Sequence, residues 1–135
     1  MLFTEVELDY LRAPGRLGRL ATAREDGTLQ VNPVGVHVNT ELGTIDIGGR
    51  DMAASRKFKN VAANGRVALV VDDVASLDPW RVRCIEVRGV GEAIGDPTDS
   101  AVAWGPGPII RIYPRRVISF GVDRDAPARR TVARG

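Results

Sequence analysis

Basic side chains gather in one short stretch of the sequence, which makes it the first candidate for binding chemistry. The run Ser55-Arg56-Lys57, followed by Lys59, contains both lysines of the chain. It comes after Gly48-Gly49 and Arg50 and has the pattern of a helix start. The first amides of a helix carry partial positive charge, so a helix start beside arginine and lysine favours phosphate. The sequence therefore predicts an anion site that includes Arg50, Ser55, Arg56 and Lys57.

The same basic residues have a simpler interpretation. Phe58, Val61 and Ala62 recur at helical spacing, so the charged side chains could form the solvated face of an amphipathic helix. Asp51 could cap this helix and compete with any anion for its first amides. Asn64-Gly65 is typical of a helix end. Spacing alone leaves both interpretations open.

A second group of unusual residues lies in the segment 29–38, LQVNPVGVHV. Pro33 cannot donate a ladder hydrogen bond and Gly35 weakens a strand, so this segment is an edge, a bulge or a surface that another molecule approaches. His37 is the only histidine, so neither a histidine-based metal cluster nor a zinc site of the usual spacing is expected. No nucleophile elbow, Walker loop or dinucleotide-binding glycine motif is present. An enzyme with this sequence would therefore rely on a bound cofactor.

Composition narrows the partners and the compartment. The formal net charge is only +2 and no basic run is interleaved with aromatic residues, so we expect no nucleic-acid partner. Cys84 is the only cysteine, which excludes an intrachain disulfide and fits a reducing compartment. The first ten residues lack the pattern of a secretory signal, and no window approaches 18 apolar residues. We therefore expect a cytoplasmic protein with no membrane partner.

The elements that must position these residues are mainly strands. Thr4 and Glu7 predict a capping box for a helix over residues 4–12. Strands are predicted over residues 16–24, 29–38, 44–48, 66–71, 81–94, 109–113 and 117–122, and loops over residues 72–80 and 96–108. Short connections favour about six antiparallel strands in a small barrel, with one helix between the third and fourth strands.

Two strand segments have features of their own. Residues 66–71, RVALVV, form a nearly continuous apolar run that is typical of a strand buried on both faces. Gly89 and Gly91 would let the long strand over residues 81–94 bend at a barrel corner. The whole chain, residues 1–135, is expected to be a single domain, with a helix in residues 1–14, a barrel over residues 16–123 and a loose tail over residues 124–135.

The order of the sequence motifs is more specific than any one of them. RLGRLATA, QVNPVG, ELGTIDIGGR, SRKFKNV, RVALVVDD, DPWRVR, EVRGVGEAI and IIRIYPRRVISFGVD follow one another along the chain. Together they resemble the split-barrel flavin and deazaflavin oxidoreductases, the superfamily of pyridoxamine 5'-phosphate oxidase. Within it the chain looks most like the small actinobacterial proteins that depend on the deazaflavin coenzyme F420.

This resemblance implies an FMN-binding type of split β-barrel, mainly β, with six antiparallel strands and a cofactor site shared by the two subunits of a homodimer. The implied cofactor is F420, with FMN as the alternative. Its ring would lie against Asn32, Pro33, Val34, Gly35, His37, Ile47 and Gly48. Arg56 and Lys57 match the Ser-Arg-Lys motif that holds the cofactor phosphate in this family.

The chain departs from the family pattern at its C-terminal end. It lacks the Arg-x-His motif with which pyridoxamine phosphate oxidases hold their substrate, so that activity is not expected. Phe120 stands where relatives often have tryptophan. Cys84 lies near a position that contacts the cofactor in some members, although a small buried thiol is the simpler interpretation.

The predicted activity is hydride transfer from reduced F420 to an electron-poor double bond of an organic substrate. The alternatives are an FMN-dependent oxidoreductase of the same fold and a non-catalytic protein that binds the flavin or deazaflavin. No catalytic residue is assigned, and solvent, His37 and Tyr113 are the candidate proton donors. The substrate is not predicted, because the loops over residues 72–80 and 96–108 contain no recognisable motif.

Overall fold

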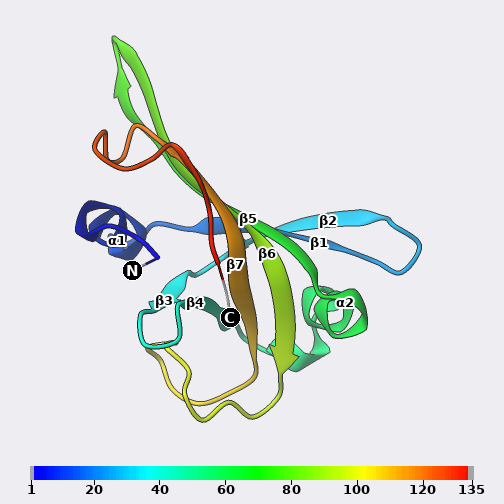
Figure 1. The fold of residues 1–135 in the computed structure, drawn as a ribbon. Coiled ribbons are helices and arrows are strands. Elements are labelled where there is room, and N and C mark those ends of the chain that lie inside the picture. Colours follow the sequence, from blue (N-terminus) through cyan, green and yellow to red (C-terminus); the bar gives the residue numbers. More distant parts are fainter. Residues whose placement is uncertain (1, 134–135) are drawn as a thin grey trace.

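The computed structural model describes residues 2–133, in which all strands belong to one antiparallel sheet (Figure 1). The helices are α1 (Glu5–Arg12), a 3-10 turn (Met52–Ala54) and α2 (Arg56–Asn64). The strands are β1 (Gly18–Ala23), β2 (Leu29–Val34), β3 (His37–Asn39), β4 (Thr44–Ile47), β5 (Arg66–Leu77), β6 (Trp80–Ile94), β7 (Ile109–Phe120) and β8 (Arg129–Thr131). Their order in the sheet is β2-β1-β5-β6-β7-β4-β3, and β8 pairs with β7.

The prediction of a mainly β, antiparallel chain is confirmed, but the prediction of six strands is wrong. The described residues contain eight strands, and the sheet is not closed because β2 and β3 stand at its two ends. These two strands come from the single strand predicted over residues 29–38. Pro33 and Gly35 weaken that segment, and after Val34 the chain crosses from one end of the sheet to the other.

The segment after residue 108 forms one strand where two were predicted. β7 runs through Pro114 because its pairing with β6 shifts register between Arg88 and Gly89. At Gly89 a Cβ atom would lie 2.2 Å from the carbonyl oxygen of Tyr113, so only glycine fits this close approach. The bulge tolerates a proline that cannot donate a ladder hydrogen bond.

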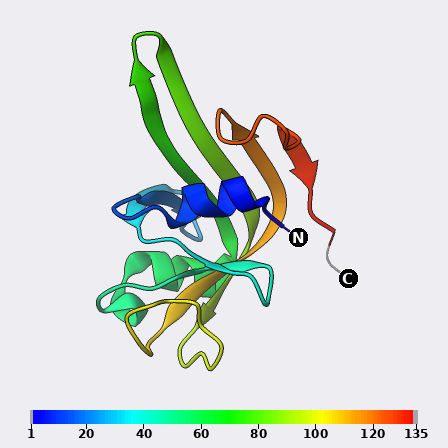
Figure 2. The same ribbon diagram turned by 90° about the vertical axis from the view of Figure 1, so that its left-hand side faces the viewer.

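Residues 72–80, predicted as a loop, instead extend the β5–β6 hairpin into an arm. β5 continues to Leu77, β6 begins at Trp80, and the turn contains a cis peptide bond between Asp78 and Pro79. The arm projects well beyond the rest of the chain (Figures 1 and 2). Cross-strand pairing continues to its tip, where Leu77 pairs with Trp80. Val74, Leu77 and Trp80 remain exposed on it.

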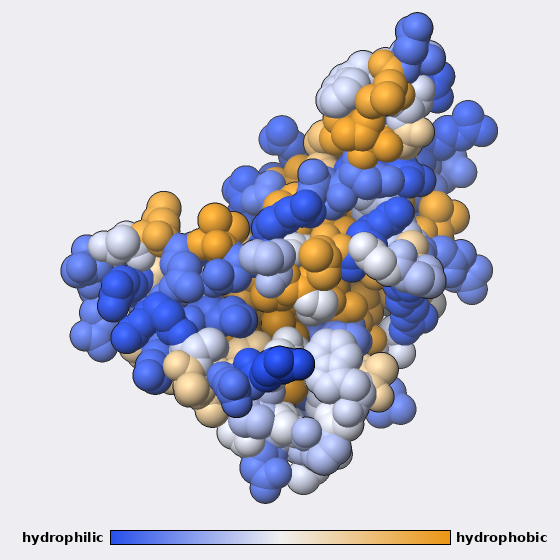
Figure 3. Space-filling view, turned by 180° about the vertical axis from the view of Figure 1, so that it is seen from behind, coloured by the Kyte–Doolittle hydropathy of each residue, from blue (hydrophilic) through white to orange (hydrophobic). Residues whose placement is uncertain are grey.

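The apolar strand β5 is covered on one face only. Leu69 and Val71 are buried in the core, whereas Ala68 and Val70 point to the other face and are partly exposed. The prediction of burial on both faces is therefore wrong for the single chain. Figure 3 shows apolar side chains at the surface of the arm and of the β1–β2 hairpin.

Both ends of the described chain are joined to the same region. The predicted capping box of α1 is present, because Thr4 and Glu7 exchange hydrogen bonds. Glu7 is fully buried and also pairs with Arg130 of β8 at 2.6 Å. Part of the tail that was expected to be loose is thus ordered by strand pairing and by this ion pair. None of the helices in residues 2–133 has the length and apolar character needed to cross a bilayer.

The bulge at Gly89 gives the first prediction. Gly89→Ala should destabilise the protein by about 1–3 kcal/mol or more, because the added methyl group meets backbone atoms that cannot rotate away. Gly95→Ala is the matched control, since its Cβ would meet no atom within 4 Å. Urea denaturation measures both, and equal midpoints for the two variants would contradict the role of the bulge.

Candidate functional site

The start of α2 is capped by Ser55. Its hydroxyl accepts a hydrogen bond from the Phe58 amide at 3.3 Å and donates one to the Met52 carbonyl at 2.6 Å. Asp51, which was predicted as a possible cap, has a left-handed backbone with φ of 50° and makes no capping hydrogen bond. Gly65 ends the helix with φ of 68°, as predicted. The first turn of α2 therefore presents its basic side chains without a competing acidic cap.

One face of α2 and the β1–β2 turn form a cavity of about 430 Å³, which we call the basic pocket. Arg24, Arg56 and Lys59 bring three positive charges to it, and Glu25 and Asp26 also line it. Residues 56 and 59 are three positions apart and therefore share a helix face. The sequence singled out Lys59 as part of the basic run, whereas nothing in it indicated Arg24. Arg50 and Lys57 do not line this pocket.

A chain of amide side chains leads from the basic pocket to β2. Asn60, which is buried, donates to the hydroxyl of Thr22 at 3.1 Å and to the side-chain oxygen of Gln30 at 3.3 Å. Gln30 in turn donates to the side-chain oxygen of Asn32 at 2.7 Å. Buried amides need such partners, so this network fixes α2 against β1 and β2. Sequence reasoning did not identify Asn60, Gln30 or Thr22 as part of the site.

Two predicted glycines, Gly35 and Gly48, lie beneath the loop that follows β6. A Cβ atom on Gly48 would lie 2.9 Å from Val102 and 3.2 Å from the Trp104 indole. A Cβ atom on Gly35 would lie 3.5 Å from the same indole. We call Gly35 and Gly48 the glycine surface, and Val102 with Trp104 the cap. The loop was predicted to be irregular, but the sequence did not indicate that its side chains cover the glycines.

His37 lies beside the glycine surface. Its ring meets Trp104 edge to face, with 4.8 Å between the centroids, and both line a cavity of about 400 Å³ together with Arg12 and Arg16. Within residues 2–133 no atom forms a hydrogen bond with the buried Nε2 of His37. Burial lowers the pKa of His37, and the negative charge of Asp46 only partly offsets this effect. The imidazole is therefore neutral near pH 7.

The other residues that were predicted to contact the cofactor ring lie on β2 and β4, and their environments differ. The side chains of Val34 and Ile47 are part of the hydrophobic core, so only their backbones could face a ligand. Asn32 is half-buried and Pro33 is exposed on β2. Gly35 and His37 line the cavity beneath the cap, while Arg56 lines the basic pocket. The structure therefore divides the predicted residues between two cavities instead of gathering them in one.

A buried ion pair fixes the loop that carries the cap. Arg111 on β7 donates to Asp46 on β4 at 2.9 and 3.2 Å, and the two residues are only 4% and 0% exposed. Asp46 also accepts from the backbone amide of Ala101 at 2.9 Å, and Arg111 pairs with the carboxylate of Asp99 at 3.0 Å. Asp99 and Ala101, which precede Val102 in the loop, are thus both attached to the sheet.

The electrostatics of this pair favour the charged carboxylate. Burial by itself would raise the pKa of Asp46, but hydrogen bonds from Arg111, from the Ala101 amide and from Asn39 outweigh burial and lower it. Hydrogen bonds to Asp46 and Asp99, together with their negative charges, raise the pKa of Arg111 despite its burial. Both groups are therefore ionised, and the loop is held by charged hydrogen bonds.

Other candidate groups lie elsewhere. Tyr113 donates to Glu92 at 2.8 Å, and Cys84 pairs in register with Phe120, which is exposed. Burial raises the pKa of the Cys84 thiol, so this thiol stays protonated near pH 7. No group of three or more metal-ligating side chains occurs in residues 2–133.

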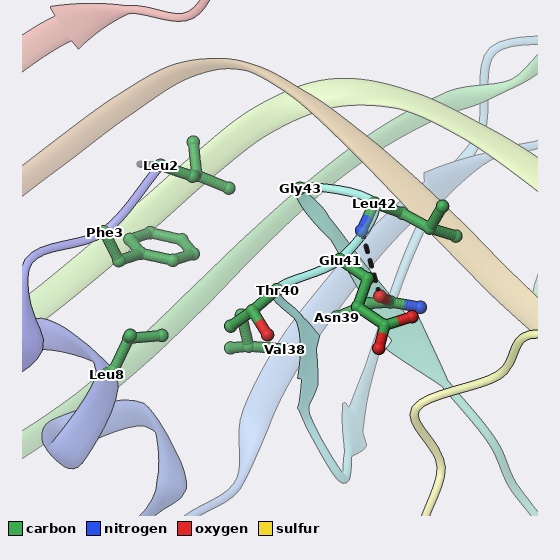
Figure 4. Close-up of a pocket in the computed structure, with 9 residues that line it drawn as sticks. All are labelled: Leu2, Phe3, Leu8, Val38, Asn39, Thr40, Glu41, Leu42 and Gly43. Atoms are coloured by element: carbon green, nitrogen blue, oxygen red, sulfur yellow. Dashed lines mark hydrogen bonds between the residues drawn. The ribbon is translucent and has the colours of Figure 1, made fainter.

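A separate cavity of about 310 Å³ lies between α1 and the β3–β4 turn (Figure 4). Leu2, Phe3 and Leu8 line one side of it, and residues of the β3–β4 turn line the other. None of the predicted cofactor residues lines this cavity. It is therefore distinct from the basic pocket and from the cavity beneath the cap. Among residues 2–133, Val38 is the one residue that lines both this cavity and the cavity beneath the cap.

Comparison with known proteins assigns the chain to a family. Residues 6–131 match the pyridoxamine 5'-phosphate oxidase family, and the chain belongs to that family. It is 45% identical over 125 residues to the 5a,11a-dehydrotetracycline/5a,11a-dehydrooxytetracycline reductase of Streptomyces rimosus subsp. rimosus, a match that covers 93% of this chain and 87% of that enzyme.

Solved structures agree with this assignment of the fold. An F420 reductase superimposes with a TM-score of 0.53 at 25% identity, covering 78% of this chain and 91% of the other. The FAD binding protein from Mycobacterium smegmatis superimposes with a TM-score of 0.61 at 20% identity, covering 85% and 92%. The predicted resemblance is thus confirmed, and the relationships support an oxidoreductase class that uses a flavin or deazaflavin.

The ion pair beneath the cap gives the second prediction. Asp46→Ala should cost about 3–5 kcal/mol of stability, because it leaves the Arg111 charge buried without its partner. The control is Asp72→Ala, whose pair with Arg19 is about half exposed and should be worth at most about 1 kcal/mol. Chemical denaturation near pH 7 measures both changes.

The pH dependence of the same variant tests the sign of the pKa shift. The folded-state pKa of Asp46 lies below its ordinary value of 3.8, so the stabilisation is fully present above that value and is lost as the pH falls through the folded-state pKa. The stability difference between the wild type and Asp46→Ala should therefore shrink in acid. A difference that grows with acidity would contradict this assignment.

Proposed function

We propose that this protein is an F420-dependent reductase that reduces an electron-poor carbon–carbon double bond of an organic substrate. The observation that carries this proposal is the 45% identity, over nearly the whole chain, to a reductase named for a dehydrotetracycline. The likeness to an F420 reductase supports the choice of cofactor. The proposed location is the cytoplasm, which the lone cysteine, Cys84, fits.

The basic pocket suits the anionic part of such a cofactor. A deazaflavin carries a phosphate and an acidic glutamate tail, and Arg24, Arg56 and Lys59 supply positive charge beside the first turns of α2. Arginine can bind phosphate through two parallel hydrogen bonds. The buried Asn60 network keeps the helix, and with it Arg56 and Lys59, in a fixed position on the sheet.

The glycine surface suits the planar ring, because a backbone without Cβ atoms allows close approach. When bound, the reduced deazaflavin supplies the hydride. Gly35 and Gly48 would set the distance of the ring from the sheet. The neutral imidazole of His37 could accept or donate a hydrogen bond at the ring edge through its unpaired Nε2. Alignment of the reacting atoms can contribute about 7 kcal/mol or more to such a reaction.

We also propose a homodimer. The outward face of β1, β2 and β5 carries Ala21, Val31 and Ala68, which the strand register places side by side. Leu29 and Val31 are 76% and 64% exposed, and the half-covered strand β5 continues this apolar face. Exposed apolar patches of this kind mark protein interfaces. A second copy would bury this face and could complete the cofactor site.

Titration of the purified protein with F420 and with FMN, followed by fluorescence, tests the cofactor. We expect F420 to bind, and Arg56→Ala to weaken binding about tenfold or more, since a charged hydrogen bond is worth about 1.5–3 kcal/mol. The control is Arg115→Ala, which changes an exposed arginine outside the basic pocket and should leave the affinity unchanged. Binding of FMN without binding of F420 would reject the proposed cofactor.

Activity is tested by single-turnover oxidation of reduced F420 with a panel of enones and quinones. A reductase should show a rate that depends on the added substrate. A protein that only stores or delivers the cofactor would show none, and this result would reject the proposed reaction.

Light scattering in solution tests the dimer. The wild type should have the mass of two chains, and Val31→Asp should be monomeric because it places a charge in the proposed interface. Val6→Asp is the control, since Val6 is also exposed, at 50%, but lies on α1. A monomeric wild type would contradict the proposal.

A further inference from the structure

The cap covers the surface on which a planar ring would lie. Val102 is 9% exposed and rests on Gly48, whereas Trp104 is 62% exposed although its indole edge reaches both glycines. The two cap residues are therefore held unequally. An indole with most of its surface in water loses little apolar burial when it moves, so Trp104 is the part of the cap that can leave most readily.

The backbone is held tightly just before the cap and contains two glycines after it, before β7 begins at Ile109. On the N-terminal side, Asp99 and Ala101 are attached to the buried pair of Arg111 and Asp46. On the C-terminal side, Gly105 and Gly107 have φ angles of +118° and +151°, and a Cβ atom on either would meet nothing within 4 Å. Glycine is the residue that tolerates changes of such backbone angles. Residues 102–104 can thus swing about the attached N-terminal side.

Beneath the closed cap, one polar atom of His37 has no hydrogen-bond partner among residues 2–133. This atom is the buried Nε2, and the Trp104 ring lies against the imidazole. A buried polar atom without a partner costs free energy that water or a ligand can recover. Opening of the cap would let either one reach this nitrogen. The closed state is therefore stabilised by apolar contact and destabilised by the unpaired nitrogen.

We propose that Trp104 occupies the place of the planar ring and must swing away before a ring can lie on the glycine surface. Trp104 is then a specificity-determining residue. A ligand can displace the indole only if its contacts with Gly35, Gly48 and His37 are more favourable in free energy than those of the indole. The identity of that ligand as a deazaflavin rests on the proposed function, but the displacement of the indole by a ring does not.

The single histidine makes the cap testable without any cofactor. Diethyl pyrocarbonate reacts with the unprotonated imidazole, and trypsin releases residues 25–50, a peptide with His37 as its only histidine. Mass spectrometry of this peptide gives the modification rate at about pH 8, well above the ordinary histidine pKa of about 6.5. The rate should be slow in the wild type and should rise about tenfold or more in Trp104→Ala.

Two further variants separate the cap from general loosening. Gly48→Ala places a methyl group 2.9 Å from Val102 and 3.2 Å from Trp104, so it should unseat the cap and also speed modification. Trp80→Phe changes the other tryptophan, on the distant arm, and should leave the rate unchanged. Denaturation midpoints show whether each variant is folded. Equal modification rates in the wild type and in folded Trp104→Ala would overturn the proposal.

The cofactor experiment distinguishes this inference from the proposed function. In Trp80→Phe, Trp104 is the only tryptophan left, so its emission reports on the cap during titration with FMN and with F420. We expect binding to change this emission and to protect His37 from modification in Trp104→Ala. Binding without either change would overturn displacement while leaving the cofactor assignment intact. Absence of binding by both would reject the proposed function, and fast modification in Trp104→Ala would still support the mobile cap.

Discussion

The arrangement of the site depends on one buried carboxylate. Asp46 has no exposure to water, so its charge must be matched by donors within the fold. Arg111 supplies two hydrogen bonds from β7, Asn39 one from β3 and Ala101 one from the loop after β6. One charge on β4 therefore joins β3, β7 and the loop that follows β6. Because Val102 and Trp104 follow at once, the same charge determines where the cap meets Gly48.

The sequence predicted local elements better than long-range arrangement. Capping residues and glycines act locally, so the helix capped by Thr4 and the helix end at Gly65 could be predicted, although the cap of α2 is Ser55 and not Asp51. Residues 29–38 and 109–122 were divided wrongly because Pro33 and Pro114 have opposite effects. Pro33 lies where the edge strand ends, whereas a bulge in β7 itself, with Arg115 as the extra residue, accommodates Pro114. That bulge depends on Gly89 in another strand, which no local pattern reveals.

The candidate site was predicted in part for the same reason. Arg56 was identified from a local motif and lies in the basic pocket. Arg24 and Asn60 join it only because the β1–β2 hairpin packs against α2, and Trp104 covers Gly48 only because Asp46 attaches the loop to the sheet. These are long-range contacts between residues with no distinctive spacing, so sequence reasoning missed them. The separation into two cavities follows from the same packing.

The pairing of Arg130 with Glu7 has a consequence for how the chain tolerates shortening. Glu7 is buried within α1, and its counter-charge comes from Arg130, which lies 123 positions further along the chain. Arg12 and Arg16, at and just beyond the end of that helix, line the cavity that holds His37. Deleting Arg130 together with the residues that follow it would thus leave the buried Glu7 carboxylate without its counter-charge, in the helix that leads to a wall of this cavity. Affinity tags and fusion partners belong beyond Thr131, where they leave this contact intact.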